Sequence, residues 1–276
     1  MKMRARWLGL SSIAALVACA EVGSAPDVPA AIELSAFPSP AIIIGDTLRD
    51  STGAVAPIEA IVRNVQGDVI ADATIRYLYA DFGRDSALAV DSVTGIVRAL
   101  KTATGTTSRL AARVGLSLQV LRTIAIIQRP DSLSAPATIL PLFTTTLADT
   151  GRTGATQNTS ADFAVVVRHV DSVTAAATTV ASWPVRFELL SPANATNDTT
   201  RAVFLVNESG RPSTLDTTDN SGNAARRVRI RAASYPSTDA VDTVVVRAVS
   251  SYKGVLLRGA PIRMVLPVKR GTSGGS

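Results

Sequence analysis

Short runs of alternating side chains, separated by turn residues, fill most of the chain from position 31 to position 268. In one such run, Ile58, Ala60 and Val62 share one side, while Glu59 and Arg63 lie on the other. Successive side chains of a strand point to opposite faces of a sheet, so this run predicts a half-buried strand. Many short strands with little helical periodicity predict an all-β sandwich or barrel.

The second half of the chain has the same alternation, with longer polar intervals between the strands. Its clearest strand places Trp183, Val185, Phe187 and Leu189 on one face. The pattern predicts that this face belongs to a core. It therefore makes Trp183 a core residue rather than an exposed aromatic platform for a ligand.

Prolines follow the last apolar run of the first half, at Pro130, Pro136 and Pro141. Proline fixes φ and removes a hydrogen-bond donor, so a sheet is expected to stop where prolines gather. We therefore predict two tandem β-sandwich modules, one at 31–128 and one with long loops at 130–268. The last residues, 269–276, are expected to form a flexible tail.

The first 18 residues have the pattern of an export signal. Lys2, Arg4 and Arg6 precede an apolar run at 7–17, and no acidic residue occurs before Glu21. A membrane-spanning helix needs roughly 20 apolar residues, so this run is too short to remain as an anchor. A basic start, a short apolar middle and small residues before a cleavage site predict a signal peptide at 1–18.

The tetrapeptide Leu16-Val17-Ala18-Cys19 holds the only cysteine of the chain and resembles a bacterial lipobox. This resemblance implies cleavage after residue 18 and lipid attached to Cys19. Residues 19–30 would then form the lipidated N-terminus and a flexible tether. The protein would be exported and held in the bacterial cell envelope, at the outer membrane or the cell surface. Ala18-Cys19-Ala20 also fits an ordinary signal-peptidase site, so both processing routes remain open.

A set of motifs in the first half resembles the bacterial Ig-like domains of group 2. The most specific is the run at 90–100, in which Val90-Asp91 is followed by Thr94-Gly95 and Ala99, and the runs at 44–48 and 67–70 match earlier positions of the family. The resemblance implies an Ig-like sandwich at 31–128. In this sandwich Tyr77 stands where the family usually has tryptophan, so its hydroxyl needs a partner.

The run at 90–100 also has a physical interpretation as a hairpin. Gly95 can adopt the positive φ that a tight turn requires. We expect Val90, Ile96 and Leu100 to pack inward around that turn.

The turn at 217–224 is similar to one in bacterial Ig-like domains of group 1, known from invasin- and intimin-like adhesins. The similarity implies a second Ig-like sandwich at 130–268. The hairpin of the first module is not expected to recur there.

Composition limits the classes of function. Hydrophobic residues make up 46% of the chain and charged residues 18%, which argues against wholesale disorder. The formal charge of +6 falls to +3 without residues 1–18, so no nucleic-acid partner is expected. One cysteine permits no disulfide within the chain, and one histidine without a second thiol excludes the usual zinc spacings. No metal, no cofactor and no catalytic residue is predicted.

Two groups of polar residues need separate interpretations. His169 ends an apolar strand and is expected to be a structural residue near solvent, because catalysis would also need a nucleophile and an orienting acid. Arg227, Arg229 and Arg231 fall on one side of another strand. They form either a stripe that binds an acidic glycan or lipid head group, or a solvated face that discourages edge-to-edge pairing.

The sequence therefore predicts a non-catalytic, envelope-anchored lipoprotein that displays Ig-like modules for adhesion, scaffolding or protein interaction. The alternative is a binding protein for envelope or extracellular polysaccharide. In either case the expected partners are the membrane, through the N-terminal lipid, and a protein or glycan whose identity the sequence leaves open.

Overall fold

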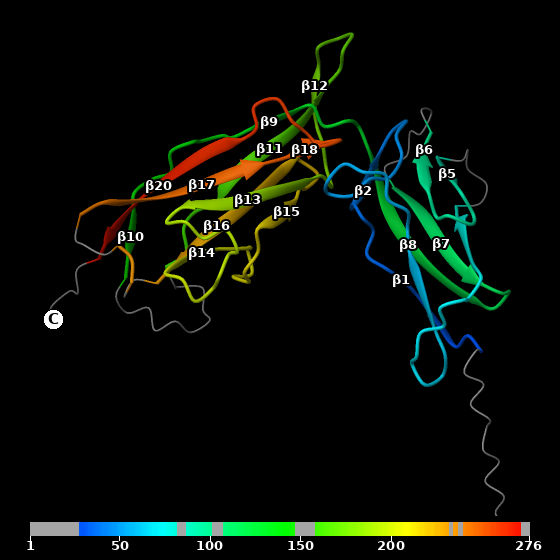
Figure 1. The fold of residues 1–276 in the computed structure, drawn as a ribbon. Helices are drawn as coiled ribbons and strands as arrows, with labels where there is room; N and C mark the ends of the chain where they lie inside the picture. Colours follow the sequence, from blue (N-terminus) through cyan, green and yellow to red (C-terminus); the bar gives the residue numbers. More distant parts are fainter. Residues whose placement is uncertain are drawn as a thin grey trace, which may run out of the picture.

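The structure is a computed structural model that describes residues 28–81, 87–100, 107–146, 158–231, 234–236 and 240–271. The predicted signal peptide and Cys19 lie outside these ranges. Within these ranges all regular secondary structure is β-strand. The strands form two groups that are joined near residue 130 (Figure 1).

The first group, here called the first module, contains strands β1 to β8. Its largest sheet has the order β2-β8-β7-β4, and the pairs β1-β3 and β5-β6 form smaller sheets. The strands are β1 (Ala31–Leu34), β2 (Ala41–Ile43), β3 (Ala60–Arg63), β4 (Ile75–Tyr79), β5 (Leu88–Val90), β6 (Val97–Ala99), β7 (Thr107–Val114) and β8 (Leu118–Ile127).

The second group, here called the second module, contains strands β9 to β20. One sheet has the order β10-β20-β17-β13-β15, and the other has the order β12-β11-β16-β14 with β9 also paired to β11. The strands are β9 (Ser132–Ser134), β10 (Phe143–Thr145), β11 (Phe163–Val170), β12 (Ala177–Thr179), β13 (Pro184–Ser191), β14 (Val203–Val206), β15 (Leu215–Thr217), β16 (Asn223–Ile230), β17 (Asp242–Val249), β18 (Ser251–Tyr252), β19 (Val255–Leu256) and β20 (Ile262–Arg270).

Both modules begin with a strand that changes sheets. In the first module β1 pairs antiparallel with β3, and after Pro38 and Pro40 the chain continues as β2, parallel to β8. In the second module β9 pairs antiparallel with β11, and after Pro136 and Pro141 it continues as β10, parallel to β20. Proline cannot donate to a sheet ladder, which explains the break in each case. With the order β9-β11-β16-β14 in one sheet, this is the strand arrangement of Ig-like sandwiches. The predicted tandem β-sandwich fold is confirmed.

Each module has its own apolar core. In the first, Val97, Ala99, Leu110 and Ile124 are fully buried, and in the second the corresponding residues include Phe163, Val165, Val167 and Phe187. Tyr77 lies in the first core, and its hydroxyl accepts a hydrogen bond from the Ala60 backbone at 3.2 Å. Trp183 is buried in the second core, as the alternation predicted.

One detail of the predicted hairpin at 90–100 is wrong. The buried residues of β6 are Val97 and Ala99, whereas Ile96 is 39% exposed and Leu100 is half-buried. Val90 pairs with Val97, so these two side chains share a face, and Ile96 lies on the opposite one. A shift of one residue moves every side chain of a strand to the other face, and the prediction began β6 one residue too early.

The expectation that this hairpin does not recur is also wrong. The sequence Val-Asp-Ser-Val-Thr occurs at 90–94 and again at 170–174. In both copies the aspartate Oδ1 accepts hydrogen bonds from two backbone N–H groups of the turn, at 2.7 to 2.9 Å. The residue that follows each copy has positive φ, 72° at Gly95 and 57° at Ala175. Side-chain capping by aspartate therefore builds the same turn in both modules.

Replacement of Gly95 by alanine is expected to destabilise the first module. Positive φ costs an L-residue about 1–2 kcal/mol. At Gly95 the added Cβ would also lie 2.5 Å from the Ile58 backbone oxygen, which adds about 1–3 kcal/mol of overpacking. Denaturant unfolding of Gly95→Ala measures the sum.

Gly115→Ala is the matched control, because Gly115 has φ 59° and its added Cβ would meet nothing within 4 Å. It should show the conformational cost alone. Equal losses of unfolding free energy in the two variants would contradict the close approach of Gly95 to Ile58.

Candidate functional site

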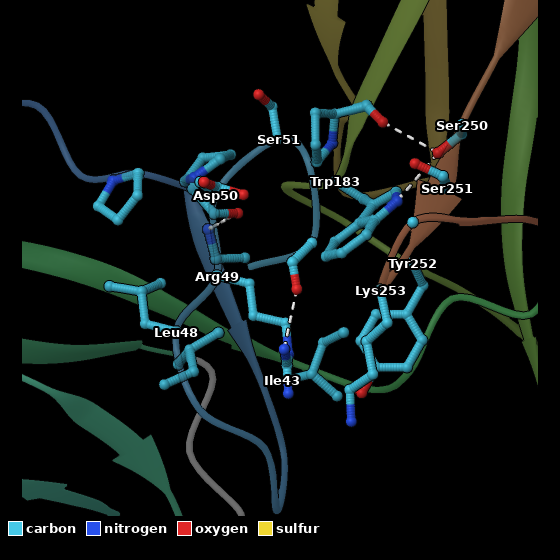
Figure 2. Close-up of a pocket in the computed structure, with 18 of the residues that line it drawn as sticks. Ile43, Leu48, Arg49, Asp50, Ser51, Trp183, Ser250, Ser251, Tyr252 and Lys253 are labelled. Atoms are coloured by element: carbon cyan, nitrogen blue, oxygen red, sulfur yellow. Dashed lines mark hydrogen bonds between the residues drawn. The ribbon is translucent and has the colours of Figure 1, made fainter. Parts of the chain in front are cut away.

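A cleft with a volume of about 270 Å³ lies between the two modules. The first module contributes residues 38–43 and the loop at 46–53, which follows β2. The second contributes the start of β13 and the segment from the end of β17 through β18. Figure 2 shows Arg49 and Asp50 of the first module facing Trp183 and Tyr252 of the second.

Asp46 is the centre of the polar contacts across this cleft. Its carboxylate accepts a hydrogen bond from the Tyr252 hydroxyl at 2.6 Å, and the Lys253 ammonium lies 3.3 Å away. Arg49, from the same loop, donates to it through Nε at 3.0 Å and through Nη2 at 3.2 Å. Two residues of the second module thus bind a carboxylate of the first.

The local environment keeps Asp46 charged. Burial acts to raise the pKa of Asp46, but the hydrogen bonds from its neighbours outweigh burial and hold this pKa well below the usual value of an aspartate. Burial, followed by the hydrogen bond and charge of Asp46, raises the pKa of Tyr252. Tyr252 therefore stays protonated and remains a hydrogen-bond donor to a permanent anion.

Aromatic and hydroxyl groups of the second module support this contact from behind. The rings of Trp183 and Tyr252 meet edge to face, with centroids 6.3 Å apart at 71°. The indole N–H of Trp183 donates to Ser250 Oγ at 3.0 Å, and Ser250 donates in turn to the Pro184 carbonyl at 3.0 Å (Figure 2). The hydrogen bond of its N–H fixes Trp183. The packing of Tyr252 against the Trp183 ring then orients the Tyr252 hydroxyl towards Asp46.

The two modules also touch through backbone and through apolar side chains. A Cβ added at Gly53 would lie 2.5 Å from the backbone nitrogen of Gly254, so the two loops are in direct contact. Ala41, Ile43 and Ile127 of the first module belong to the same apolar cluster as the second module's core. The joint therefore combines hydrophobic burial with a charged hydrogen-bond network, which we call the Asp46 latch (Asp46, Arg49, Tyr252 and Lys253).

The Asp46 latch is better suited to joining modules than to binding a small molecule. Small-molecule sites typically have volumes of about 300–1,000 Å³, and this cleft is smaller. Its central carboxylate is already bound to three side chains of the protein itself. The anion and the groups that bind it therefore all belong to this chain.

The residues that the sequence singled out lie elsewhere. Cys19 is outside the described ranges. Arg227 and Arg229 project from β16 on the side opposite Val228 and Ile230, and Arg231 follows the strand.

The surroundings of these arginines engage part of their charge. Arg227 Nε donates to Asp162 at 2.6 Å. Arg231 donates to the Thr199 carbonyl at 2.6 Å, and its guanidinium lies 5.9 Å from the centre of the Phe204 ring. The hydrogen bond and the charge of Asp162 raise the pKa of Arg227.

His169 fixes the connection between the modules. Its Nδ1 lies 2.7 Å from Asp131 Oδ2 and 2.9 Å from the Arg129 carbonyl. Asp131 also accepts from the Val170 backbone at 3.0 Å and from Arg129 Nε at 2.7 Å. This arrangement gives the histidine a structural role at the end of β11.

Within the described ranges, no group of three or more His, Cys, Asp or Glu side chains could hold a metal ion. These ranges also contain no helix of the length and apolar character needed to cross a bilayer.

The sequence identified Trp183 as a core residue but did not identify the latch. In the sequence, Asp46 stands out only as part of the family-like run at 44–48, and no motif contains Tyr252. An aspartate beside Gly45 and a tyrosine-lysine pair in a turn are ordinary turn residues, and no local signal connects them. Their partnership follows from the orientation of the modules.

Comparison with known proteins gives only distant likenesses. No protein-family model and no curated protein matches the chain. The adhesin InvE of Yersinia pseudotuberculosis is similar at 14% identity, with a TM-score of 0.29 over 86% of this chain and 58% of that structure. The surface-layer protein SbsC, domains 4-9, is similar at 12% identity, with a TM-score of 0.28 over 89% of this chain and 32% of its own. The protocadherin GammaB4 extracellular domain is similar at 15% identity, with a TM-score of 0.27, 88% of this chain and 32% of its own.

This chain spans between 32% and 58% of the length of these three structures. Likenesses this loose assign neither a family nor a partner.

Asp46→Asn is expected to weaken the joint. The substitution removes the charge that Arg49, Lys253 and Tyr252 bind, and a hydrogen bond to a charged group contributes about 1.5–3 kcal/mol. Thermal unfolding should show a lower Tm, and small-angle scattering should show a wider range of distances between the modules. Asp72→Asn, which makes the same change of charge at an exposed loop residue of the first module, should leave both unchanged.

The effect of Asp46 should also depend on pH in a defined direction. Its pKa is lower in the folded protein than in an unfolded chain, where aspartate titrates near about 3.9. Its contribution is therefore complete above about pH 4 and is lost as pH falls towards the lowered pKa. The difference in unfolding free energy between the wild type and Asp46→Asn should shrink over that interval. A difference that grows on acidification would contradict the latch.

Proposed function

We propose that the protein is a non-catalytic lipoprotein of the bacterial cell envelope that presents two Ig-like modules as one unit for adhesion, scaffolding or protein interaction. The observation that carries this proposal is the Asp46 latch. The chain uses a half-buried carboxylate and the side chains that bind it to hold one module against the other. That use suits a protein whose task is to hold a surface in a fixed place and orientation.

The composition of the joint supports a stiff unit. Apolar side chains of the first module continue into the core of the second, and the latch surrounds this contact with charge-assisted bonds. Interfaces between domains usually permit relative motion unless they are large and hydrophobic. Here the hydrophobic contact and the polar network restrict the same movement.

The side chains that could take part in catalysis form structural hydrogen bonds instead, which supports a non-catalytic protein. His169 and Asp131 hold the connection between the modules, and Asp46 holds the joint. Aspartates 91, 171 and 219 accept backbone hydrogen bonds within their own turns. Each of these groups has a structural partner that occupies the atoms catalysis would need.

Anchoring is proposed from the lipobox-like run that ends at Cys19, outside the described ranges. A single acyl chain gives only marginal membrane binding, whereas two or three chains hold a protein stably. An exported chain with a single cysteine forms no internal disulfide, so packing alone would hold each module together.

Cys19→Ala should abolish both lipid labelling and membrane association, because it removes the only thiol that can carry the acyl groups. Metabolic labelling with a fatty acid, followed by membrane fractionation, measures the two effects. Ser24→Ala, which leaves the lipobox-like run intact, should label and fractionate like the wild type. A Cys19→Ala protein that still co-sediments with membranes would refute the anchor.

Binding of an acidic polysaccharide is the second proposal. It is favoured by the placement of Arg227, Arg229 and Arg231 on one side of β16 and its continuation. Arg227 forms a salt bridge with Asp162. The test therefore changes the two other residues of the stripe, Arg229 and Arg231. Arg229→Glu/Arg231→Glu should lose retention on an acidic polysaccharide column, whereas Arg168→Glu/Arg211→Glu, with the same change of charge at two exposed positions, should keep it. Equal retention of the two variants would exclude the stripe.

A further inference from the structure

The end of the first module that lies away from the joint carries four exposed apolar side chains. Leu116 is 94% exposed, Val65 71%, Val69 57% and Val28 56%. We call these four residues the apolar tip. They come from three separate segments: the start of the described chain, the loop after β3, and the turn between β7 and β8.

These three segments lie together. Pro29, Asn64, Val69 and Gly115 line one shallow hollow, which brings the neighbours of all four apolar residues to the same end of the sandwich. Figure 1 shows the start of β1, the loop that follows β3 and the β7–β8 turn gathered at the end of the module farthest from β12 and the second module.

The geometry of β8 separates the tip from the joint. Leu116 lies two residues before β8 begins, and Ile127, at the other end of β8, packs in the cluster that forms the joint. Ten strand residues rise about 34 Å. The apolar tip and the second module are therefore at opposite ends of the first module.

The length of chain before the tip determines what the tip can reach. Cys19 and Val28 are nine positions apart. Nine residues span at most about 30 Å even when fully extended. If Cys19 carries lipid, as proposed above, the tip cannot be farther than this from the membrane surface. Because the joint lies beyond the tip, the tip is the part of the modules that meets the bilayer first.

We propose that the apolar tip rests on the phospholipid surface, with Leu116 and Val65 inserted among the head groups, so that the two modules stand away from the membrane. This inference rests on the proposed lipid anchor. Exposed apolar patches usually mark an interaction surface, and transfer of leucine and valine side chains from water into a lipid interface is favourable.

Charges at this end are mixed, so a neutral lipid surface is sufficient. Arg76 and Arg113 face each other across β4 and β7, while Asp68 and Asp72 line the hollow beside the tip. The attraction is consequently assigned to the apolar side chains, and zwitterionic lipid is the appropriate surface for a test.

Val173 provides a matched comparison within the same chain. It is 90% exposed in the β11–β12 turn of the second module, which repeats the capped turn of the first. Like Leu116, Val173 is a strongly exposed apolar residue in a turn between two strands, but it belongs to the second module, which lies beyond the joint.

The test uses the full processed, lipidated chain bound to vesicles of zwitterionic phospholipid whose acyl chains carry bromine, a quencher of tryptophan fluorescence. Tryptophan is introduced as Leu116→Trp, as Val65→Trp in a second variant, or as Val173→Trp in the control. The native Trp183 is buried and supplies a common background. Both tip variants should show blue-shifted emission and quenching about twofold stronger than the control, because interfacial insertion reaches the boundary of the acyl chains.

Each other outcome rejects the inference, and the outcomes can be distinguished. Vesicle flotation without quenching at positions 116 and 65 would leave the lipid anchor intact and overturn the apolar tip. Failure of the unsubstituted chain to float would refute the anchor and the tip together. A blue shift that appears without vesicles and grows with protein concentration would show that a second copy of the chain covers the tip.

Discussion

A single half-buried carboxylate, that of Asp46, connects the two sandwiches. Asp46 comes from a loop of the first module, yet two of the side chains that bind it come from the second. Removing a charge from water is costly unless opposite charge and hydrogen bonds replace the solvent, and Arg49, Lys253 and Tyr252 supply both. The apolar residues Ile43 and Ile127 lie beneath this network, so the position of each module depends on the other.

Other charged side chains of the structure are also paired within the chain. Arg226 is buried beside Asp216, Arg247 pairs with Glu188 across two strands, and Arg227 pairs with Asp162. Aspartates cap the turns of both sandwiches from within. In a chain without disulfides, such contacts restrict the loops that packing alone would leave loose. Several of the arginines that could suggest a polyanion partner are paired with carboxylates of the same chain.

The sequence predicted the local features well and the distant ones poorly, for physical reasons. Alternation identified the strand that contains Trp183 and Phe187, because burial of one face leaves a period of two in the sequence. It misassigned Ile96, because a one-residue error in the start of β6 exchanges the faces. The latch could not be predicted, since Asp46 and Tyr252 are 206 residues apart and meet only once both sandwiches have formed.

The shared apolar cluster at the joint has a consequence for synthesis and export. Ile43 and Ile127 belong to strands that are complete long before Tyr252 and Leu257 leave the ribosome or the translocation channel. During that interval the first sandwich exposes an apolar surface that the second module covers only after synthesis is complete. Premature termination or proteolysis after residue 130 would leave that surface permanently uncovered, so the hazard to the cell lies in partial copies of the chain.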